Sequence, residues 1–254
     1  NVCSVFNACV RRARSWTGSP CAAVDEGGLT RVESPPGRFR PEFFCRQDES
    51  ADPLFYDMPR LVVHIDEQAV AAVAEYLGEV LPVGAVVLDL MSSWRSHLPE
   101  DHAISTLVGL GMNAVELQEN PQLDERVVHD LNADPALPLA SGRFGAAVVT
   151  VSIQYMTRPV EVFREVRRVL GDGGTFHVIF SDRMFPTKAV AVWHSLPDPR
   201  RRAELIAAYF DEAGGFVAPQ FVDRSPSAQS DPVYVVRAAR AEEASRWAGE
   251  GAAG

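Results

Sequence analysis

The sequence predicts an α/β protein with a doubly wound, mostly parallel sheet of seven strands, the last two of which are antiparallel. Short apolar runs typical of buried strands alternate with amphipathic helical segments through the middle of the chain. The last two apolar runs have no helix between them, which indicates an antiparallel pair at the edge of the sheet. A chain of 254 residues is long enough for one such domain with extensions.

Helices are expected where apolar residues recur every three or four positions between capping residues. The first begins after Asp66 and is closed by Pro82. The second, over 158–170, is the clearest, because Pro159 lies in its first turn and arginines lie near its end, before the glycine that stops it. The third covers 199–213 and ends at two glycines. Strands are expected at 86–90, 106–110, 126–129, 144–151, 175–180, 216–222 and 233–237.

The chain is expected to have three parts. Residues 1–50 show no sustained period and form an N-terminal extension, partly disordered or targeting-like; 51–238 form the folded domain; 239–254 form a polar tail. The first 24 residues lack Asp and Glu but contain several arginines, as organelle transit peptides do. A plastid or mitochondrial location is therefore an alternative to a disordered tail.

Composition narrows the expected partners. A formal net charge of -10 argues against a nucleic-acid backbone as the main partner, and no apolar run reaches the length of a membrane span. The cysteines lack metal-ligand spacing, and no other cluster suggests a metal site. They predict idle thiols in a reducing, intracellular and cytoplasmic compartment. These cysteines are Cys3, Cys9, Cys21 and Cys45.

Ligands of such sheets bind beyond the carboxyl ends of the strands, and the strand ends here carry a resemblance. The ordered segments are VVLDLMSSW, VGLGMNA, VVHDLNADPALPLASGRFGAAVVTVSIQYM and PVEVFREVRRVLGDGGTFHVIF. The last two are the most specific: a carboxylate ends the third strand, a Leu-Pro turn precedes the fourth, and a helix leads to a Gly-Gly turn. Residues from about 55 to 237 resemble a class I, Rossmann-like, S-adenosylmethionine-dependent methyltransferase of the small-molecule, type 11-like branch.

This resemblance implies a cofactor, S-adenosyl-L-methionine, and methyl transfer to an unidentified small-molecule acceptor. It implies that Asp130 accepts a hydrogen bond from the adenine amino group. Asp89 would lie beside the methionine moiety and order the following loop through backbone amides. The implied cofactor-binding residues are Asp89, Met91, Ser92, Ser93, Gly111, Met112, Asn113, Asp130, Leu131 and Ser152.

The chain departs from the family pattern in the first loop. The family's three glycines, which let the backbone approach the cofactor closely, are replaced by Met91, Ser93 and Arg95. Pro99 interrupts the short segment that follows, so the usual first crossover helix must be reduced. Gly111 stands where the family has an acid for the ribose, and Asn113 is the expected substitute. These changes predict a reshaped cofactor pocket, with a lost pocket as the alternative.

The sequence offers candidates for the acceptor side. His64 and His97 are candidate general bases, because an unperturbed histidine titrates near neutrality, and Tyr155 is a third catalytic candidate. The expected substrate-binding residues are Tyr56, Arg60, Gln154, Tyr155, Arg183 and Phe185.

Two other functions remain open at this point. The segment from Gly109 to Ala114 matches a dinucleotide-binding fingerprint, and Asp130 follows at the distance of a ribose-binding acid, so an NAD(P)-binding oxidoreductase is one alternative. Against it, the helix after Ala114 is cut short by Pro121, and a buried strand precedes the motif. The second alternative is a catalytically inactive methyltransferase-fold binding module, which the missing glycines favour. Cofactor binding separates the three.

Overall fold

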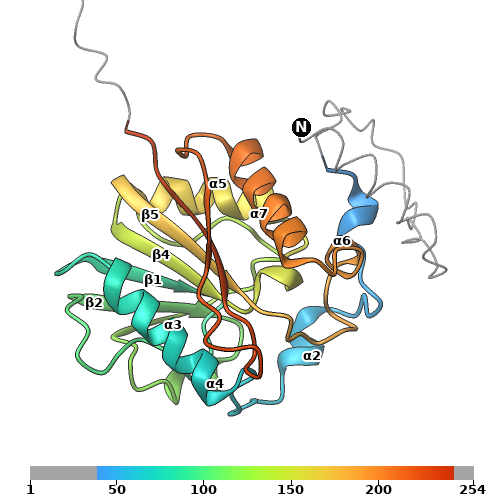
Figure 1. Ribbon diagram of the computed structural model, residues 1–254, viewed down its shortest axis with the longest axis horizontal. Coiled ribbons are helices and arrows are strands. Elements are labelled where there is room, and N and C mark those ends of the chain that lie inside the picture. Colours follow the sequence, from blue (N-terminus) through green and yellow to red (C-terminus); the bar gives the residue numbers. More distant parts are fainter. Residues whose placement is uncertain (1–38, 243–254) are drawn as a thin grey trace, which may run out of the picture.

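Short runs rich in valine and leucine form the strands of a seven-stranded sheet with helices on both faces (Figure 1). The computed structural model describes residues 39–242. The strands are β1 (Val86–Leu90), β2 (Thr106–Gly111), β3 (Glu125–Val128), β4 (Phe144–Thr150), β5 (Leu170–Phe180), β6 (Gln220–Asp223) and β7 (Tyr234–Ala239). The helices are η1 (Pro41–Phe44), α2 (Asp52–Tyr56), α3 (Glu67–Val80), α4 (Ala114–Gln118), η2 (Ile153–Tyr155), α5 (Pro159–Val169), α6 (Ala191–His194) and α7 (Pro199–Ala213).

The strand order is β3-β2-β1-β4-β5-β7-β6. Strands β1 to β5 pair in parallel, whereas β7 pairs antiparallel with both β5 and β6. This arrangement confirms the prediction of a doubly wound, mostly parallel sheet with an antiparallel C-terminal pair. The carboxyl ends of β1 and β4, which are neighbours, lie at the point where the strand order reverses, and ligands of such sheets bind there.

Successive strand residues point to opposite faces, so the sheet separates two hydrophobic cores. On one face α5 and α7 pack together, and Phe163 of α5 meets Phe176 of β5 and Phe210 of α7 with ring centroids 4.9 and 4.8 Å away. On the other face the apolar stripe of α3, which includes Val73 and Leu77, covers the sheet. Asp66 caps α3 by accepting from the Ala69 amide, as its position in the sequence predicts.

The element boundaries differ from expectation around α5. The helix ends at Val169 because Leu170 already has an extended backbone, so β5 begins there and not at residue 175. Gly171 lies inside β5 and does not stop the helix. Strand β6 is shorter than expected, and Phe216 forms only an isolated bridge. Between β1 and β2 there is no helix, consistent with the expected reduction of the first crossover.

Residues 39–50, which the sequence assigned to the N-terminal extension, pack against the core. Phe43 and Cys45 are buried. The rings of Phe39 and Phe44 lie 5.0 and 6.2 Å from that of Tyr209 on α7. Aromatic residues rather than periodicity anchor this segment, which explains why the pattern of apolar residues did not reveal it. Residues 1–38 and the end of the expected tail, 243–254, lie outside the described residues.

Cys45 is disulfide-bonded, so the prediction of an idle thiol is wrong for this residue. The bond removes the support that the cysteines gave to a reducing compartment. Cys3, Cys9 and Cys21 lie outside the described residues.

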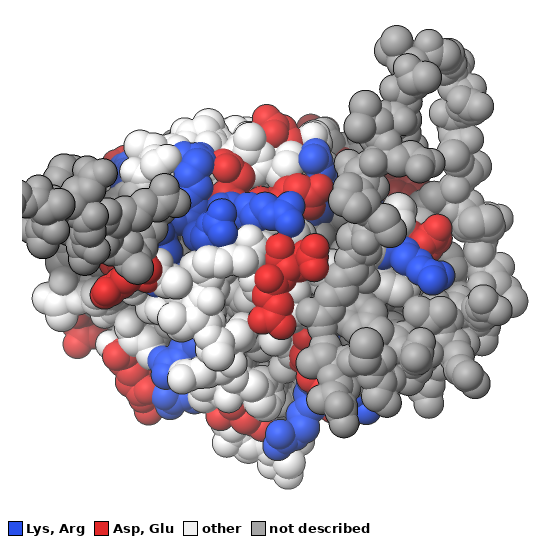
Figure 2. Space-filling view, turned by 90° about the horizontal axis from the view of Figure 1, so that it is seen from above, with Lys and Arg blue, Asp and Glu red and all other residues white. Residues whose placement is uncertain are grey.

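Charges are mixed on the face seen in Figure 2, where a row of basic side chains is bordered by acidic ones. Helix α5 and its N-cap show the same mixing, because Arg168 pairs with Glu165 at 2.7 Å and the N-cap Arg158 with Glu161 at 3.5 Å. Among the residues described, no helix combines the length and the apolar character needed to cross a membrane.

Candidate functional site

A cleft of about 640 Å³ lies at the carboxyl ends of the parallel strands, within the usual size range of small-molecule sites. All but one of the residues that the sequence nominated line it. They are Tyr56, Arg60, His64, Asp89, Met91, Ser92, Ser93, His97, Gly111, Met112, Asn113, Asp130, Leu131, Ser152, Tyr155, Arg183 and Phe185. The topology brings these positions together, and the role of each stays a prediction.

Gln154 is the exception. It is 1% exposed and does not line the cleft. Its Nε2 donates to the carbonyl oxygens of Val151 and Arg183, which ties the loop after β4 to the loop after β5. The short helix η2 turns the side chain inward, so the expectation of a substrate contact at Gln154 does not fit this position.

The loop after β1 is held by side-chain hydroxyls around Asp89. Asp89 Oδ2 accepts from Ser92 Oγ and Ser96 Oγ, both at 2.6 Å. The buried Asn120 donates to Ser96 Oγ at 2.9 Å and to the Ser93 carbonyl at 2.8 Å. Burial raises the pKa of Asp89 to about 6, against the opposing effect of the two serine hydrogen bonds. Asp89 thus orders its loop through serine hydroxyls, not through the backbone amides that the resemblance implied.

Strained backbone conformations gather at this cleft. Three non-glycine residues of the described chain have positive φ angles, Met91 (57°), His97 (57°) and Val151 (49°), and all three line the cleft. Met91 stands at the family's first glycine position, and its backbone adopts the left-handed conformation that favours glycine. The loop therefore keeps a glycine-type turn although the glycine is gone. Such strain concentrates at functional sites.

The expected ribose site is remodelled at the end of β2. The main chain of Ser92 crosses Gly111, with the Ser92 amide donating to the Leu110 carbonyl at 2.8 Å. A Cβ at position 111 would collide with the Ser92 carbonyl oxygen, so no acid fits there. Asn113 is not free to replace it. Its side chain caps α4 by accepting from the Val115 and Glu116 amides and donates to the Tyr56 carbonyl.

Glu116 brings a carboxylate to this edge of the cleft instead. One oxygen accepts from the Arg60 amide at 2.7 Å and the other from Ser93 Oγ at 2.6 Å. The side chain thereby joins α4 to the loop after β1 and to the segment after α2. Sequence analysis missed Glu116, although its place one turn into the helix after β2 was a signal that could have identified it.

Asp130 forms a turn at the end of β3. Its Oδ1 accepts from the amides of Asn132 and Ala133 at 2.9 and 3.1 Å. Within the described chain no side chain or amide bonds its Oδ2, and Asp130 lines the cleft. One carboxylate oxygen therefore shapes the loop while the other remains available to a ligand.

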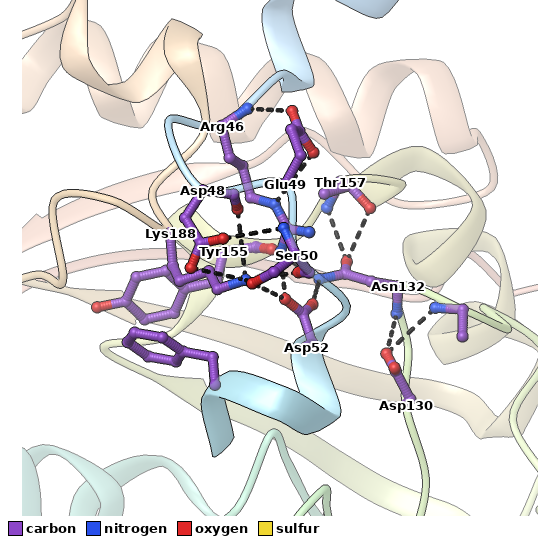
Figure 3. Close-up of polar contacts among 12 residues, drawn as sticks. Arg46, Asp48, Glu49, Ser50, Asp52, Asp130, Asn132, Tyr155, Thr157 and Lys188 are labelled. Atoms are coloured by element: carbon purple, nitrogen blue, oxygen red, sulfur yellow. Dashed lines mark hydrogen bonds and ion pairs between the residues drawn. The ribbon is translucent and has the colours of Figure 1, made fainter. Parts of the chain in front are cut away.

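Asn132 joins this loop to two other segments (Figure 3). Its Nδ2 donates to Asp52 Oδ2 at 2.7 Å and to the Tyr155 carbonyl at 3.0 Å. Its Oδ1 accepts from the Thr157 amide at 2.8 Å. Asn132, Asp52 and the buried Lys188 were not nominated from the sequence, because nothing in their spacing indicates that they meet.

Arg60 lies in an aromatic cage at the mouth of the cleft. Its guanidinium carbon is 4.4 Å from the centroid of Phe55 and 5.4 Å from that of Phe185. Nη2 donates to the Phe55 carbonyl at 2.9 Å, while Nη1 is buried without a hydrogen-bond partner among the described residues. No carboxylate of the described chain forms an ion pair with Arg60. A cation that is largely enclosed is normally paired with an anion. The described part of the chain supplies no such counter-ion for Arg60.

The candidate bases differ in their surroundings. The pKa of His64 is lowered by burial first and then by Arg60; Glu116 opposes this, and Arg183 adds a smaller lowering. Burial lowers the pKa of the His97 side chain to about 4. The Tyr155 hydroxyl accepts from the Phe185 amide at 2.8 Å, and burial raises its pKa. His64 is therefore the candidate whose imidazole is neutral at pH 7 without being deeply enclosed.

The cleft has further lining residues that the sequence had not assigned to a cofactor, substrate or catalytic role. They are Asp52, Val62, Val63, Ile65, Trp94, Arg95, Ser96, Leu110, Glu116, His129, Asn132, Thr150, Val151, Asp182, Met184, Pro186 and Asp231. Most come from loops whose approach to the strand ends depends on long-range contacts. Between residues 39 and 242, no three histidine, cysteine or acidic side chains gather as a metal site would require.

The sheet order and the cleft at its carboxyl edge define the Rossmann-like class of folds. Residues 95–178 match the family model described as a methyltransferase domain. This match covers about a third of the chain, within the Rossmann-like sheet.

Similar proteins add little about the reaction. Uncharacterized proteins of Mycobacterium tuberculosis and Mycobacterium bovis are 39% identical over 51 residues, which cover 20% of this chain and only 18% of theirs. The cyclase SpnF superposes with a TM-score of 0.52 at 15% identity, over 73% of this chain and 89% of SpnF. A geranyl diphosphate C-methyltransferase from Streptomyces coelicolor gives 0.49 at 15% identity, over 67% and 77%. The similarity to SpnF shows the fold alone.

Proposed function

We propose that this protein transfers a methyl group from S-adenosylmethionine to a small-molecule acceptor. The observation that carries the proposal is Asp130, which lines the cleft with one oxygen free after the other has shaped the loop behind β3. A free carboxylate oxygen there can accept a hydrogen bond from an adenine amino group. The match of residues 95–178 to a methyltransferase domain model supports the same reaction.

The residues of the cleft fit this cofactor in a modified way. Asp130 and Leu131 would hold the adenine, and the loop from Asp89 to Ser93 would face the methionine part. Glu116 would take over the ribose, because Gly111 has no room for an acid beside the Ser92 carbonyl. The hydroxyl of Thr150 is buried at the end of β4 without a partner in the described chain, which also favours a ligand in this cleft.

When bound, S-adenosylmethionine supplies an activated methyl group on a positively charged sulfur. The protein must position the acceptor and exclude water. The neutral imidazole of His64 can take a proton from an acceptor hydroxyl or amine. The missing counter-ion of Arg60 favours an acceptor that carries a carboxylate or phosphate, with Arg183 as a second cation lining the cleft.

Calorimetric titration tests the proposal. S-adenosylhomocysteine should bind, whereas NAD and NADP should not bind comparably. Asp130→Asn keeps an oxygen to shape the loop but loses the charge that the adenine amino group meets. The affinity of this variant for S-adenosylhomocysteine should fall by about 10- to 150-fold, since a charge-assisted hydrogen bond contributes roughly 1.5–3 kcal/mol.

The titration also has outcomes that would reject the proposal. Tight NAD binding without any response to S-adenosylhomocysteine would establish an oxidoreductase. Absence of binding for both would favour a methyltransferase fold that no longer uses the cofactor. The glycine-poor first loop is the feature that favours a fold without the cofactor as an alternative.

A further inference from the structure

Arg46, Asp52 and Lys188 form a buried cluster of charges (Figure 3), and Asp52 also lines the cleft. The side chain of Lys188 is 0% exposed, that of Asp52 3% and that of Arg46 8%. Lys188 Nζ and Arg46 Nη1 lie 3.3 and 2.6 Å from the same oxygen of the Asp52 carboxylate, Oδ1. Lys188 Nζ also donates to the Ser50 carbonyl at 2.7 Å. The two cations come from different segments, and Asp52 joins them.

The other oxygen of Asp52 leads to the cleft. Oδ2 accepts from Asn132 Nδ2 at 2.7 Å, and the Asn132 amide donates to Asp130 Oδ1 at 2.9 Å. A continuous chain of polar contacts therefore runs from Lys188, in the loop after β5, through Asp52 and Asn132 to Asp130. Each oxygen of the Asp52 carboxylate has a separate task, because one binds the cations and the other binds Asn132.

Backbone contacts attach the same N-terminal segment to the loop after β5. The Asp48 amide donates to the Thr187 carbonyl at 2.9 Å, and the Ala191 amide donates to the Cys45 carbonyl at 2.8 Å. Asp48 also pairs with Lys188 at 3.3 Å. Residues 45–52 are thus fixed to one side of the cleft while Asp52 reaches the adenine side.

Stability alone is a weak explanation for this cluster. Desolvation of a buried ion pair often cancels its Coulombic gain, and apolar residues of the same volume can serve as well. A buried carboxylate with defined partners on both oxygens fixes geometry more than it adds stability. Here the geometry that it fixes is the position of Asn132, and with it the turn that Asp130 forms.

We propose that Asp52 is a positioning residue of the cofactor site, which holds the Asp130 loop in its binding conformation through Asn132. Lys188 and Arg46 hold the Asp52 carboxylate in its orientation. The proposal rests on the proposed function for its effect on cofactor affinity. Its effect on the loop itself requires no ligand.

Asp52→Asn is the main test. The new amide can be oriented in two ways. Its NH₂ group either faces the Asn132 NH₂ group, which is also a donor, or faces Lys188 and Arg46 in place of the oxygen that they share. The amides of Asn132 and Ala133 should then exchange hydrogen at least tenfold faster in the ligand-free protein. The affinity for S-adenosylhomocysteine should fall about tenfold. Lys188→Met, which removes a cation but keeps the volume, should change both quantities in the same direction and serves if Asp52→Asn does not fold.

A double-mutant cycle separates positioning from a general loss of stability. If Asp52 acts through the Asp130 loop, Asp52→Asn should have little further effect on affinity once Asp130→Asn is present. Additive effects would overturn the proposal. Tyr76→Phe is the matched control, because it removes the buried bond to His177, 2.7 Å long, away from the cleft. It should lower the melting temperature with affinity unchanged.

Three results separate the two proposals. Unchanged exchange at Asn132 and Ala133 in Asp52→Asn would show that the cluster does not position the loop. A lower melting temperature with unchanged affinity, as in the control, would likewise overturn it. If the unmodified protein does not bind S-adenosylhomocysteine, the proposed function fails, and the exchange measurement alone decides whether Asp52 positions the loop.

Discussion

Gly111 lies directly beneath the carbonyl oxygen of Ser92, so close that the smallest side chain at position 111 would collide with it. The loop after β1 therefore crosses the end of β2 and closes the place where an acid would otherwise meet a ribose. The same crossing fills the space in which a dinucleotide fingerprint would present its second glycine to a pyrophosphate. The main chain of this loop, more than any side chain, reshapes the cleft.

Gly111→Ala should destabilise the fold and not only weaken ligand binding. The clash is with main-chain atoms that Asp89 holds in place, so we expect a cost near the upper end of the roughly 1–3 kcal/mol typical of overpacking. Scanning calorimetry should show a melting temperature several degrees lower. Gly171→Ala is the control, because its Cβ would make only ordinary van der Waals contacts with the carbonyl oxygens of Gly142 and Phe144. Equal melting temperatures for Gly111→Ala and the unmodified protein would show that the loop does not cross here.

Asp89 should make stability depend on pH in an unusual direction. Burial raises its pKa from 3.8 to about 6. Between these values the unfolded chain ionises while the folded protein keeps the proton, so this group makes the free energy of unfolding fall as pH rises. The loss is complete above about pH 6.

Asp89→Asn should remove this dependence, since an amide oxygen can still accept from Ser92 and Ser96. The melting temperature of the variant relative to the unmodified protein should rise as pH increases from 4 to 7, because only the unmodified protein loses stability when Asp89 ionises. Calorimetric melts at matched pH values provide the measurement. A difference that stays constant over this range would contradict the raised pKa.

His64 should respond to the charge of Arg60. Burial lowers its pKa, and Arg60 and Arg183 lower it further. Arg60→Met removes one cation, so the His64 pKa should rise, and the pH below which activity falls should rise with it. Nuclear magnetic resonance titration of the imidazole protons measures the shift without any knowledge of the acceptor.

Arg158→Met is a suitable control, because Arg158 is exposed at the N-cap of α5 and pairs with Glu161. It should leave the His64 titration unchanged. If Arg60→Met lowers the His64 pKa or does not affect it, Arg60 does not act electrostatically on this candidate base. With a known acceptor, His64→Gln should reduce kcat by about 100- to 10,000-fold.

Residues 39–50 should contribute to stability. A variant that lacks 1–50 loses the buried Phe43 and the partners of Asp52 and Lys188, whereas one that lacks 1–38 retains them. Under reducing conditions, which exclude a new disulfide at Cys45 of the longer variant, the shorter variant should melt several degrees below the longer one. Identical melting temperatures would show that the contacts of 39–50 add nothing to the folded domain.

The sequence by itself determined the sheet. Alternation of strand and helix patterns gave the parallel core, and the last two runs without a helix gave the antiparallel pair, because these features depend on local periodicity. The capping residue Asp66 fixed the start of α3 for the same local reason. The strand ends then indicated that Asp89 and Asp130 would lie at the same edge of the sheet, since parallel strands bring their carboxyl ends to one edge.

Only the tertiary structure decided how the site is built. Asp52, Asn132 and Lys188 are far apart in the chain, and their contacts follow from the way the N-terminal segment docks beside β5. The crossing of Ser92 over Gly111 likewise depends on the path of a loop that has no repeating pattern. Local periodicity records which face of an element is buried. It carries no information about which distant loop covers a strand end, because that depends on packing between segments that the sequence keeps apart.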